Sequence, residues 1–416
     1  MNGDGQSGET VRCDVAIIGG GMAGATLALA LQSVGVGVVV IERDDPGRWA
    51  DQAFDGRVSA IAAGSRQVWQ SLGAWEAMAR DAEPILDIRV TDGDQPFVLH
   101  FDHQELGGGP MGHILENRRI RAALLDAVEA APGIRLMAPR GVAGIERDAA
   151  AAVVTLEGGG AVQALLVVGA DGRGSQVRES AGINQTAWRY GQGAIVTTVL
   201  HERPHEGTAE ERFLDPGPFA ILPMTDDEEG RHRSSIVWTD RADLVPAYLD
   251  LGASDFNAEL AVRFGDHLGA VQATGPRWSY PLGLNLAESY IAPRLALIGD
   301  AAHGIHPIAG QGLNLGIRDA AALAEVVVDA RRLGLDFGMT TVLDDYQRWR
   351  RFDNVALAAA TDVINLLFSN PLSPLRLVRG LGLAAVNRLG PARRLFMREA
   401  MGLAGDLPRL VRGETL

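Results

Sequence analysis

Three glycines near the amino end have the spacing that binding of a diphosphate requires. Gly19, Gly21 and Gly24 form a G-x-G-x-x-G pattern, directly after an apolar run that predicts a strand and before a run that predicts a helix. Such glycines permit a tight turn, close approach of a pyrophosphate and packing of the helix on the strand. Glu42 ends the next apolar run, close to the roughly 20-residue separation at which an acid binds a ribose hydroxyl. The pattern predicts a dinucleotide site.

A second segment with ligand-binding character is LIGDAAHGIHPIAGQGLNLGIRDAAALAE, residues 297–325. Its strand-like start ends at Asp300, a glycine-rich loop follows, and a helix opens near Gly312. A helix start presents unpaired N–H groups and the positive end of the helix dipole, so an anionic or strongly hydrogen-bonding group is expected there. The loop histidines, His303 and His306, have two interpretations: proton transfer, or shaping of the loop and packing against the ligand.

A third segment, VVGADGRGSQVRESAG, places Asp171 and Gly172 at the end of another apolar strand. Ser175 and Arg178 follow. One interpretation is a strand-end turn followed by a helix with a serine cap. The other is a third loop of the ligand site, and this segment alone does not decide between them.

The composition excludes several kinds of chemistry. All 38 basic residues are arginine, because the sequence contains no lysine, which excludes a P-loop lysine and a lysine Schiff base. Because Cys13 is the single cysteine, an intrachain disulfide and a cysteine-built zinc site are excluded. We expect Cys13 to be a small buried hydrophobic residue. The pair His100/His103 lies in an alternating strand, and the pair His201/His205 lies in a polar loop without acidic or cysteine partners, so no metal site is expected. A formal net charge of −14 argues against nucleic-acid binding.

The elements that must position these residues follow from the hydrophobic pattern. We expect a buried strand at 14–18, a helix at 22–34 and a parallel strand at 37–41. The stretch 15–41 carries no charged residue and is long enough to cross a bilayer. Its internal glycines and polar residues divide it, however, so a βαβ unit is the better interpretation.

Beyond this unit the pattern alternates between helical and extended segments. A helix is expected at 55–73, an antiparallel hairpin at 85–103, a helix at 115–130 and a β-meander at 141–172. Strand-like runs fill 190–290, and the chain is expected to be helical from about 317 to its end.

The predicted fold class is α/β, with a Rossmann-like G-x-G-x-x-G domain, an inserted and mainly antiparallel β-sheet domain, and a helical C-terminus. We expect a discontinuous nucleotide-binding domain at 1–84, 110–185 and 292–345. The substrate domain is expected at 85–109 and 186–291, and the C-terminal helical region at 346–416.

Three separated motifs match one family. With its G-x-G-x-x-G start, central Asp-Gly motif and late Gly-Asp motif, the chain resembles the single-component FAD-dependent aromatic-ring monooxygenases. Within that class HPIAGQGLNLGIRD, residues 306–319, resembles the signature of the ubiquinone-biosynthesis hydroxylases. The segments FDGRVSAIAAGS, ILEN and LFSNPLSPLRLVRGLGLAAVNRL are also similar to that family, so the resemblance covers nearly the whole chain.

This resemblance implies FAD as the cofactor and NADH or NADPH as a transient electron donor. The implied reaction is hydroxylation of the ring of a polyprenyl phenol intermediate of ubiquinone by dioxygen, through a flavin 4a-hydroperoxide. Two other enzymatic hypotheses stay open: a hydroxylase of an unrelated soluble aromatic, and a flavin reductase. A third is a non-catalytic flavin-holding scaffold subunit.

The same resemblance assigns the three glycines to the FAD pyrophosphate and Glu42 to the adenosine ribose. Asp300 is expected to bond the ribityl chain, and Asp171 to lie where the class binds both FAD and the donor. The residues expected along the isoalloxazine ring are Pro307, Gly310, Gly312, Leu313 and Asn314. Arg43, Arg57, Asn117 and Val142 complete the expected set of contacts. Since reduced flavin is negatively charged on its pyrimidine side, the helix start would stabilise it through oriented amides.

The C-terminal segment 371–416 is basic in an otherwise acidic chain. Eight arginines stand against Glu399, Asp406 and Glu414, a formal net of +5. Leucines and arginines recur at helical spacing, which suits either a capping helix pair on the FAD domain or docking on a membrane surface, a partner protein or a second copy. Because residues 1–10 do not resemble a secretory signal, we expect a cytoplasmic protein, with peripheral attachment at the inner face of the membrane as the alternative.

Overall fold

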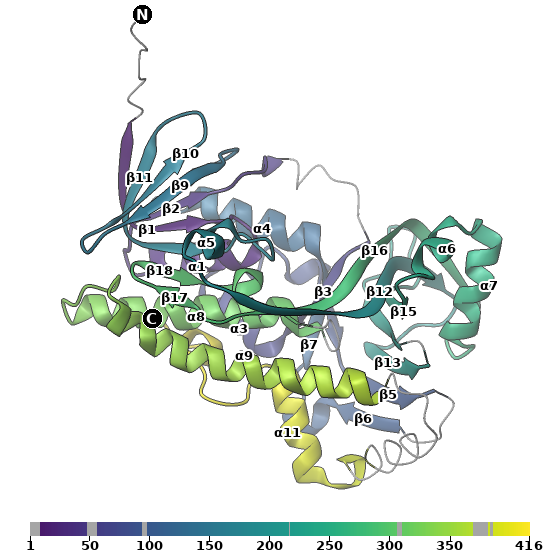
Figure 1. Ribbon diagram of the computed structural model, residues 1–416. Helices are drawn as coiled ribbons and strands as arrows, with labels where there is room; N and C mark the ends of the chain where they lie inside the picture. The colour runs from purple at the N-terminus through teal and green to yellow at the C-terminus, as the bar shows by residue number, and fades with distance from the viewer. Residues whose placement is uncertain are drawn as a thin grey trace, which may run out of the picture.

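The computed structural model describes residues 9–47, 56–93, 98–215, 217–305, 310–368, 382 and 386–416. Two large sheets lie at opposite sides of the molecule, and the long strands β12 and β16 run between them (Figure 1). Helices pack around the first sheet, and α9 (Thr340–Phe368) extends along one edge toward the second. The predicted α/β fold class is confirmed.

The first sheet is mainly parallel and carries the predicted nucleotide site. Its strands are β1 (Thr10–Ile18), β2 (Val38–Ile41), β8 (Ile134–Met137), β11 (Ala161–Gly169), β17 (Ile291–Ala292) and β18 (Leu295–Leu297), in the order β17-β18-β11-β1-β2-β8. All neighbours from β18 to β8 are parallel, and β9 (Val142–Arg147) and β10 (Ala152–Leu156) add the predicted meander to β11. These strands read as continuous Val/Ile/Leu runs because both faces of a parallel sheet are covered.

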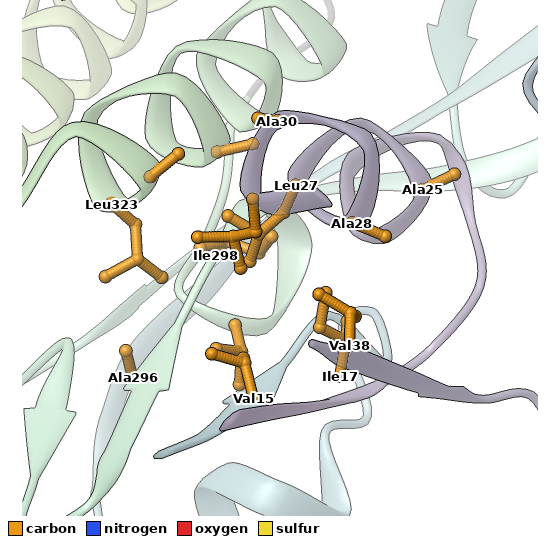
Figure 2. Packing of buried hydrophobic residues seen from close by; sticks show 14 of the residues in the cluster. Val15, Ile17, Ala25, Leu27, Ala28, Ala30, Val38, Ala296, Ile298 and Leu323 are labelled. Atoms are coloured by element: carbon orange, nitrogen blue, oxygen red, sulfur yellow. The ribbon is translucent and has the colours of Figure 1, made fainter. Parts of the chain in front are cut away.

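Helix α1 (Met22–Gln32) returns the chain from β1 to β2, as the βαβ interpretation predicted. It packs against α8 (Gln311–Arg332), and both are rich in buried alanine and leucine. Figure 2 shows Leu27 of α1 and Ile298 above Val15 of β1, with Leu323 of α8 above Ala296 of β18. This layer is the main core, so the loops that leave β1 and β18 begin from a rigid base.

The second sheet is the predicted, mainly antiparallel insertion. Its strands are β5 (Asp87–Asp92), β6 (Val98–Asp102), β12 (Gln185–His201), β13 (Thr208–Leu214), β14 (Gly217–Met224), β15 (Arg233–Arg241), β16 (Val271–Ala287) and β19 (His303–Gly304), in the order β19-β16-β12-β15-β14-β13-β5-β6. Only β13 and β5 are parallel neighbours in this sheet. Its own core includes Phe219, Trp238 and Phe256, and α6 (Val245–Asp250) and α7 (Ala253–Phe264) pack on it.

A small third sheet corrects one expectation. The segment 55–73 was expected to be helical, but Val58–Ala62 forms β3, and helix α3 begins only at Ala63. β3 pairs with β7 (Gly112–Glu116), which also pairs with β4 (Glu83–Ile85), and α4 (Asn117–Ala130) follows. Pairing with a strand more than 50 residues away in sequence decided the conformation of this short, ambiguous run.

The C-terminal part is only partly helical. α11 (Gly390–Ala400) and the 3-10 helix η5 (Arg409–Arg412) are separated by turns, so the expectation of helix to the end is wrong for this stretch. α9 begins at Thr340, so the expected boundary at 345/346 falls inside one continuous helix. In the part of the chain that the structure describes, no helix has both the length and the hydropathy needed to cross a bilayer.

Candidate functional site

Several of the predicted ligand-binding residues lie at the carboxyl edge of the parallel sheet. β1 is followed by Gly19, β2 by Glu42, β11 by the Asp171 loop, and β18 by the short 3-10 helix η3 (Gly299–Ala301), which contains Asp300. These four strands are adjacent and parallel, so their following loops lie side by side. β1 has β2 on one side and the later strand β11 on the other, and a ligand crevice is expected where strand order reverses in this way.

The glycine turn separates positions that the chain packs against from a position that it leaves open. A β-carbon at Gly19, where φ is 105°, would lie 2.3 Å from the carbonyl oxygen of Ala170. One at Gly24 would lie 2.0 Å from the carbonyl oxygen of Gly19, so helix and strand require glycine there. Among the described residues, no atom would lie within 4 Å of a β-carbon at Gly21, and no side chain caps α1. The turn thus offers open space beside a helix N-terminus, which fits a diphosphate.

Glu42 is oriented by the turn itself. Its carboxylate accepts hydrogen bonds from the backbone N–H of Gly20 at 2.7 Å and of Asp44 at 2.8 Å. Arg43 is largely exposed and lies 3.7 Å from the Asp44 carboxylate. Val142 is half-buried at the start of β9 and packs against the main core.

The Asp171 loop combines both interpretations of its sequence. The hydroxyl of Ser175 accepts the backbone N–H of Arg178 at 3.0 Å, so it caps the short helix α5 (Gln176–Ser180). Asp171 accepts the backbone N–H of Val177 at 3.2 Å through Oδ2, while its buried Oδ1 has no partner among the described residues. A buried carboxylate oxygen without a partner at a loop edge suits a donor group from a ligand.

Two arginines connect this loop to the Asp300 loop. Arg178 is almost fully buried and donates to the carbonyl oxygens of Ala301 at 2.9 Å and Arg173 at 3.0 Å. Arg173 in turn donates from Nε to the Asp300 carboxylate at 3.2 Å, and both of these side chains are about half exposed. The Asp300 carboxylate, which is predicted to bind the ribityl chain, is therefore accessible. The backbone of its loop is held by the hydrogen bond from Arg178 to Ala301.

The start of α8 is the second open helix N-terminus. Gly310 has φ 61°, and no side chain of the described residues caps the helix. The Asn314 side chain accepts the N–H of Ala62 at 2.9 Å and donates to the carbonyl oxygen of Ala60 at 2.8 Å, so it binds the helix to β3. A β-carbon at Gly312 would meet no atom of the described part of the chain within 4 Å. This end of α8 can therefore offer backbone amides to a ligand, while the Asn314 side chain is occupied.

β3 also positions two further predicted cofactor contacts, Arg57 and Asn117, near the start of α8. The backbone N–H of Asn117 donates to the carbonyl oxygen of Arg57 at 3.0 Å, and its side-chain oxygen accepts the Ser59 hydroxyl at 2.7 Å. Arg57, Asn117 and the start of α8 thus meet around one strand. Leu313 is half-buried against the main core. The predicted contacts His306 and Pro307 lie outside the described residues.

His303 is fully buried, and its geometry favours the loop-shaping interpretation. Its Nε2 lies 2.5 Å from the carboxylate of Asp319, which is equally buried. Its Nδ1 has no partner in the described part of the chain. Burial alone would raise the pKa of Asp319, but the charges and hydrogen bonds of His303 and Arg350 outweigh it and hold that pKa well below its ordinary value.

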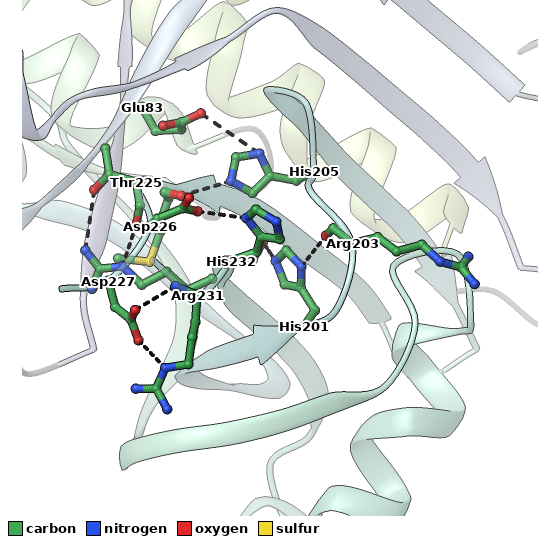
Figure 3. Close-up of polar contacts among 12 residues, drawn as sticks. Glu83, His201, Arg203, His205, Thr225, Asp226, Asp227, Arg231 and His232 are labelled. Atoms are coloured by element: carbon green, nitrogen blue, oxygen red, sulfur yellow. Dashed lines mark hydrogen bonds and ion pairs between the residues drawn. The ribbon is translucent and has the colours of Figure 1, made fainter. Parts of the chain in front are cut away.

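Three further histidines lie close together at the second sheet. Figure 3 shows His201, His205 and His232 gathered near Glu83 and Asp226. His201 binds the Arg203 carbonyl at 2.8 Å and the Ser234 hydroxyl at 3.0 Å. His205 binds the Met224 carbonyl at 2.9 Å, and His232 binds Asp226 at 2.9 Å. Among the described residues, no group of three or more His, Cys, Asp or Glu side chains is arranged to hold a metal ion.

Cys13 lies half-buried on β1, where burial raises the pKa of its thiol to about 12. The thiolate is therefore scarce at neutral pH, as expected of a cysteine that packs rather than reacts.

Sequence reasoning did not assign three buried groups that hold the site: Arg178, Asp319 and Arg350. Each is a charged residue with almost no exposure. Asp319 follows Arg318 in a mainly apolar run after Gly312, and charges inside such a run were the available signal.

The residues present fit FAD at this edge. Gly21 leaves space for a diphosphate, and Glu42 presents a fixed carboxylate. Within the described residues, Asp171 keeps an acceptor oxygen without a partner, and α8 begins without a side-chain cap.

Comparisons with known proteins agree with this geometry. Residues 12–351 match the family model described as an FAD binding domain. The chain is 52% identical over 406 residues to ubiquinone hydroxylase UbiL of Rhodospirillum rubrum, covering 97% of this chain and 93% of that protein. It is 38% identical to 3-demethoxyubiquinol 3-hydroxylase of Escherichia coli, covering 94% and 98%. Among solved structures, p-nitrophenol 4-monooxygenase PnpA of Pseudomonas putida superimposes with a TM-score of 0.78 at 20% identity, covering 95% and 99%, which shows a shared fold.

Proposed function

The chain belongs to the FAD-dependent aromatic-ring hydroxylases of ubiquinone biosynthesis, and on this premise we propose that it hydroxylates the ring of a polyprenyl phenol intermediate. The reaction breaks one ring C–H bond and forms C–OH, with O₂ and NADH or NADPH consumed and water and oxidised nicotinamide released. When bound, FAD accepts the hydride from the nicotinamide and activates the oxygen. The observation that carries the proposal is the open Gly21 turn at the strand-order switch, in a chain 52% identical to a ubiquinone hydroxylase.

The chain's own residues bind, orient and exclude water. The Gly21 turn and the start of α1 would receive the diphosphate, and Glu42 the ribose of the adenosine half. Asp300 and the Oδ1 atom of Asp171 would accept hydrogen bonds from hydroxyl groups of the ribityl part of FAD. The backbone amides at the start of α8 would stabilise negative charge on the ring system. Only one dinucleotide fingerprint is present, which supports a nicotinamide donor that visits transiently.

A division of labour between the two sheets is part of this proposal. We assign 1–84, 110–185 and 292–339 to FAD binding, and 85–109 and 186–291 to the substrate. The C-terminal region then begins at 340 rather than 346, so that α9 stays whole. Most strands of the two parts belong to separate large sheets, which supports this division. The exception is β19, which pairs with β16 of the second, or substrate, sheet.

The test is one assay with the purified protein. Its visible spectrum is recorded, and NADH or NADPH oxidation is followed with and without a short-chain prenylphenol while the product is analysed by mass. A yellow protein with a product one oxygen heavier is the expected result. Nicotinamide consumption with only hydrogen peroxide formed would favour another aromatic substrate or a flavin reductase. A scaffold role would require pathway output to persist in a variant that cannot hold FAD.

We also propose that the protein attaches to an anionic membrane surface, where a polyprenyl substrate resides. Four apolar residues on the outer face of α9 recur at helical spacing and are 38–76% exposed: Phe352, Val355, Val363 and Leu366. Leu389, Leu395 and Phe396 of the α11 region are 48–58% exposed. α9 and α11 both lie at the lower edge of the view in Figure 1. An exposed apolar helix face suits an interfacial helix.

The charges around these helices support the same partner. Arg388, Arg394 and Arg398 form no ion pair with another described residue, in a chain whose formal net charge is −14. Other arginines of the tail hold the fold, since Arg393 pairs with Glu105 at 2.8 Å and Arg409 with Asp329 at 2.6 Å. The tail therefore combines a capping role with a positively charged outer surface.

Sedimentation with vesicles of equal parts phosphatidylcholine and phosphatidylglycerol tests this attachment. Phe352→Glu combined with Val363→Glu is expected to abolish binding. Val262→Glu is the matched control, because Val262 is 82% exposed on α7 of the substrate sheet. Failure of the unmodified protein to bind these vesicles, or equal loss in the control, would refute the proposal. Light scattering of the same variants would identify a contact with a second copy instead.

A further inference from the structure

We propose that Asp319 is a positioning residue, which holds the predicted FAD-binding loop after β18 in a fixed position relative to the substrate sheet. The inference rests on the proposed function and adds to it a buried group that contacts neither cofactor nor substrate. It follows from where the hydrogen-bond donors around this one carboxylate come from.

Asp319 lies on α8 and is 0% exposed. Its Oδ2 accepts the backbone N–H of Gly299 at 3.1 Å and faces His303 Nε2 at 2.5 Å. Its Oδ1 accepts Arg350 Nε at 2.9 Å and Asn354 Nδ2 at 3.1 Å. A charge buried this deeply persists only when it is fully hydrogen-bonded, so the four donors are held as firmly as the carboxylate itself.

The first donor fixes the loop that carries Asp300. Gly299 has φ 57°, a conformation that favours glycine. A β-carbon there would lie 3.5 Å from the Ala23 β-carbon of α1 and 3.8 Å from Gly316 of α8, so the loop is closely packed between two helices. The hydrogen bond from Gly299 to Asp319 therefore sets where the next residue, Asp300, stands.

The other donors lead to the substrate sheet. His303 pairs with Leu286 of β16 as part of the edge strand β19. Arg350 and Asn354 belong to α9, whose far end reaches the same sheet. There the Asn365 side chain donates to Gln192 of β12 at 3.2 Å, and the rings of Phe368 and Phe213 stack with centroids 4.1 Å apart.

One carboxylate thus connects the predicted ribityl loop, the flavin-facing helix α8 and two separate routes to the substrate sheet. If the hydrogen bonds to Asp319 are lost, the FAD-binding loop and the substrate sheet are no longer held in a fixed relative position. Transfer of oxygen to the ring would suffer more than oxidation of the nicotinamide, because only the former requires both to be aligned.

The experiment compares Asp319→Asn with the unmodified protein. The amide keeps the shape but removes the charge and one acceptor. We expect the Kd of FAD, measured by flavin fluorescence on reconstituted apoprotein, to rise about tenfold or more. The visible circular dichroism of the bound flavin should change, and the hydroxylated product formed per nicotinamide oxidised should fall.

Asp336→Asn is the matched control. Asp336 pairs with the buried Arg294 at 2.5 Å, and Arg294 precedes β18, at the sheet edge opposite Asp300. This control is expected to lower the melting temperature without changing the FAD Kd or the flavin spectrum. Equal loss of FAD affinity in both variants, or none in Asp319→Asn, would overturn the proposal.

A second variant keeps the proposal testable if Asp319→Asn does not fold. Asn354→Ala retains the carboxylate and removes one donor, and it is expected to raise the FAD Kd about threefold. An unchanged Kd in that variant would refute the positioning role. If the unmodified enzyme yields no hydroxylated product, the proposed substrate is wrong, but FAD affinity and the flavin spectrum still decide the role of Asp319.

Discussion

Replacing Gly21 by alanine separates binding of the cofactor from stability of the fold. The added methyl group would meet no atom within 4 Å in the part of the protein that the structure describes, and Gly21 already has φ −64°, which alanine adopts readily. The free energy of unfolding should therefore change by no more than about 1 kcal/mol. The methyl group would occupy the space through which a diphosphate approaches the amides of α1.

The expected loss of FAD affinity follows from the contacts at stake. A hydrogen bond between a backbone N–H and a charged phosphate oxygen contributes about 1.5–3 kcal/mol. Displacing one such bond would raise the Kd of FAD about 10- to 100-fold, since each 1.4 kcal/mol corresponds to about tenfold. Gly24→Ala should instead destabilise the protein by about 3 kcal/mol or more, because its methyl group would lie 2.0 Å from the carbonyl oxygen of Gly19.

The assay is titration of apoprotein with FAD, combined with thermal melting of the same samples. Gly252→Ala is the matched control, since Gly252 precedes α7 with φ −59° and an equally open β-carbon position. Gly252→Ala should leave both quantities unchanged. An FAD Kd in Gly21→Ala equal to that of the unmodified protein would show that the ligand does not approach this turn, and the reasoning on the open glycine would be wrong.

Three further predictions follow from single contacts. Glu42→Gln should weaken FAD binding about tenfold in the same titration, because the carboxylate that the Gly20 N–H orients would lose its charge; unchanged affinity would contradict its assignment to the ribose. Arg178→Met should lower the free energy of unfolding in urea by about 2–4 kcal/mol and reduce the flavin content, because the Ala301 and Arg173 carbonyls would lose their donor; a purified variant with full flavin would count against that role. Burial, and then the positive charge of Arg66, lower the pKa of His113 to about 4 from an ordinary 6.5. As the pH falls, His113 therefore binds a proton in the unfolded chain at a higher pH than in the folded protein. The free energy of unfolding should fall by up to about 3 kcal/mol as the pH decreases from 6.5 toward 4. His113→Gln should remove this part of the pH dependence in urea unfolding, and an unchanged pH profile would contradict it.

Most of the nucleotide-binding edge could be predicted because its signals are local. The glycine spacing, the apolar run before it and the acid at the end of the next strand each depend on a few neighbouring residues and on regular strand and helix geometry. The prediction of β3 as helix failed for the opposite reason. Val58–Ala62 has no decisive pattern of its own, and pairing with β7 determined its conformation.

The sequence by itself determined the α/β class, the family, the dinucleotide turn and the absence of lysine and disulfide chemistry. Only the tertiary structure decided that the Asn314 side chain binds β3 and that Arg178 holds the Asp300 loop. It also decided that Asp319 accepts hydrogen bonds from α9, η3 and β19. The physical reason is that a turn or a strand is set by residues close in sequence. The partner of a buried charge depends instead on tertiary packing, which brings together residues that are far apart in the sequence.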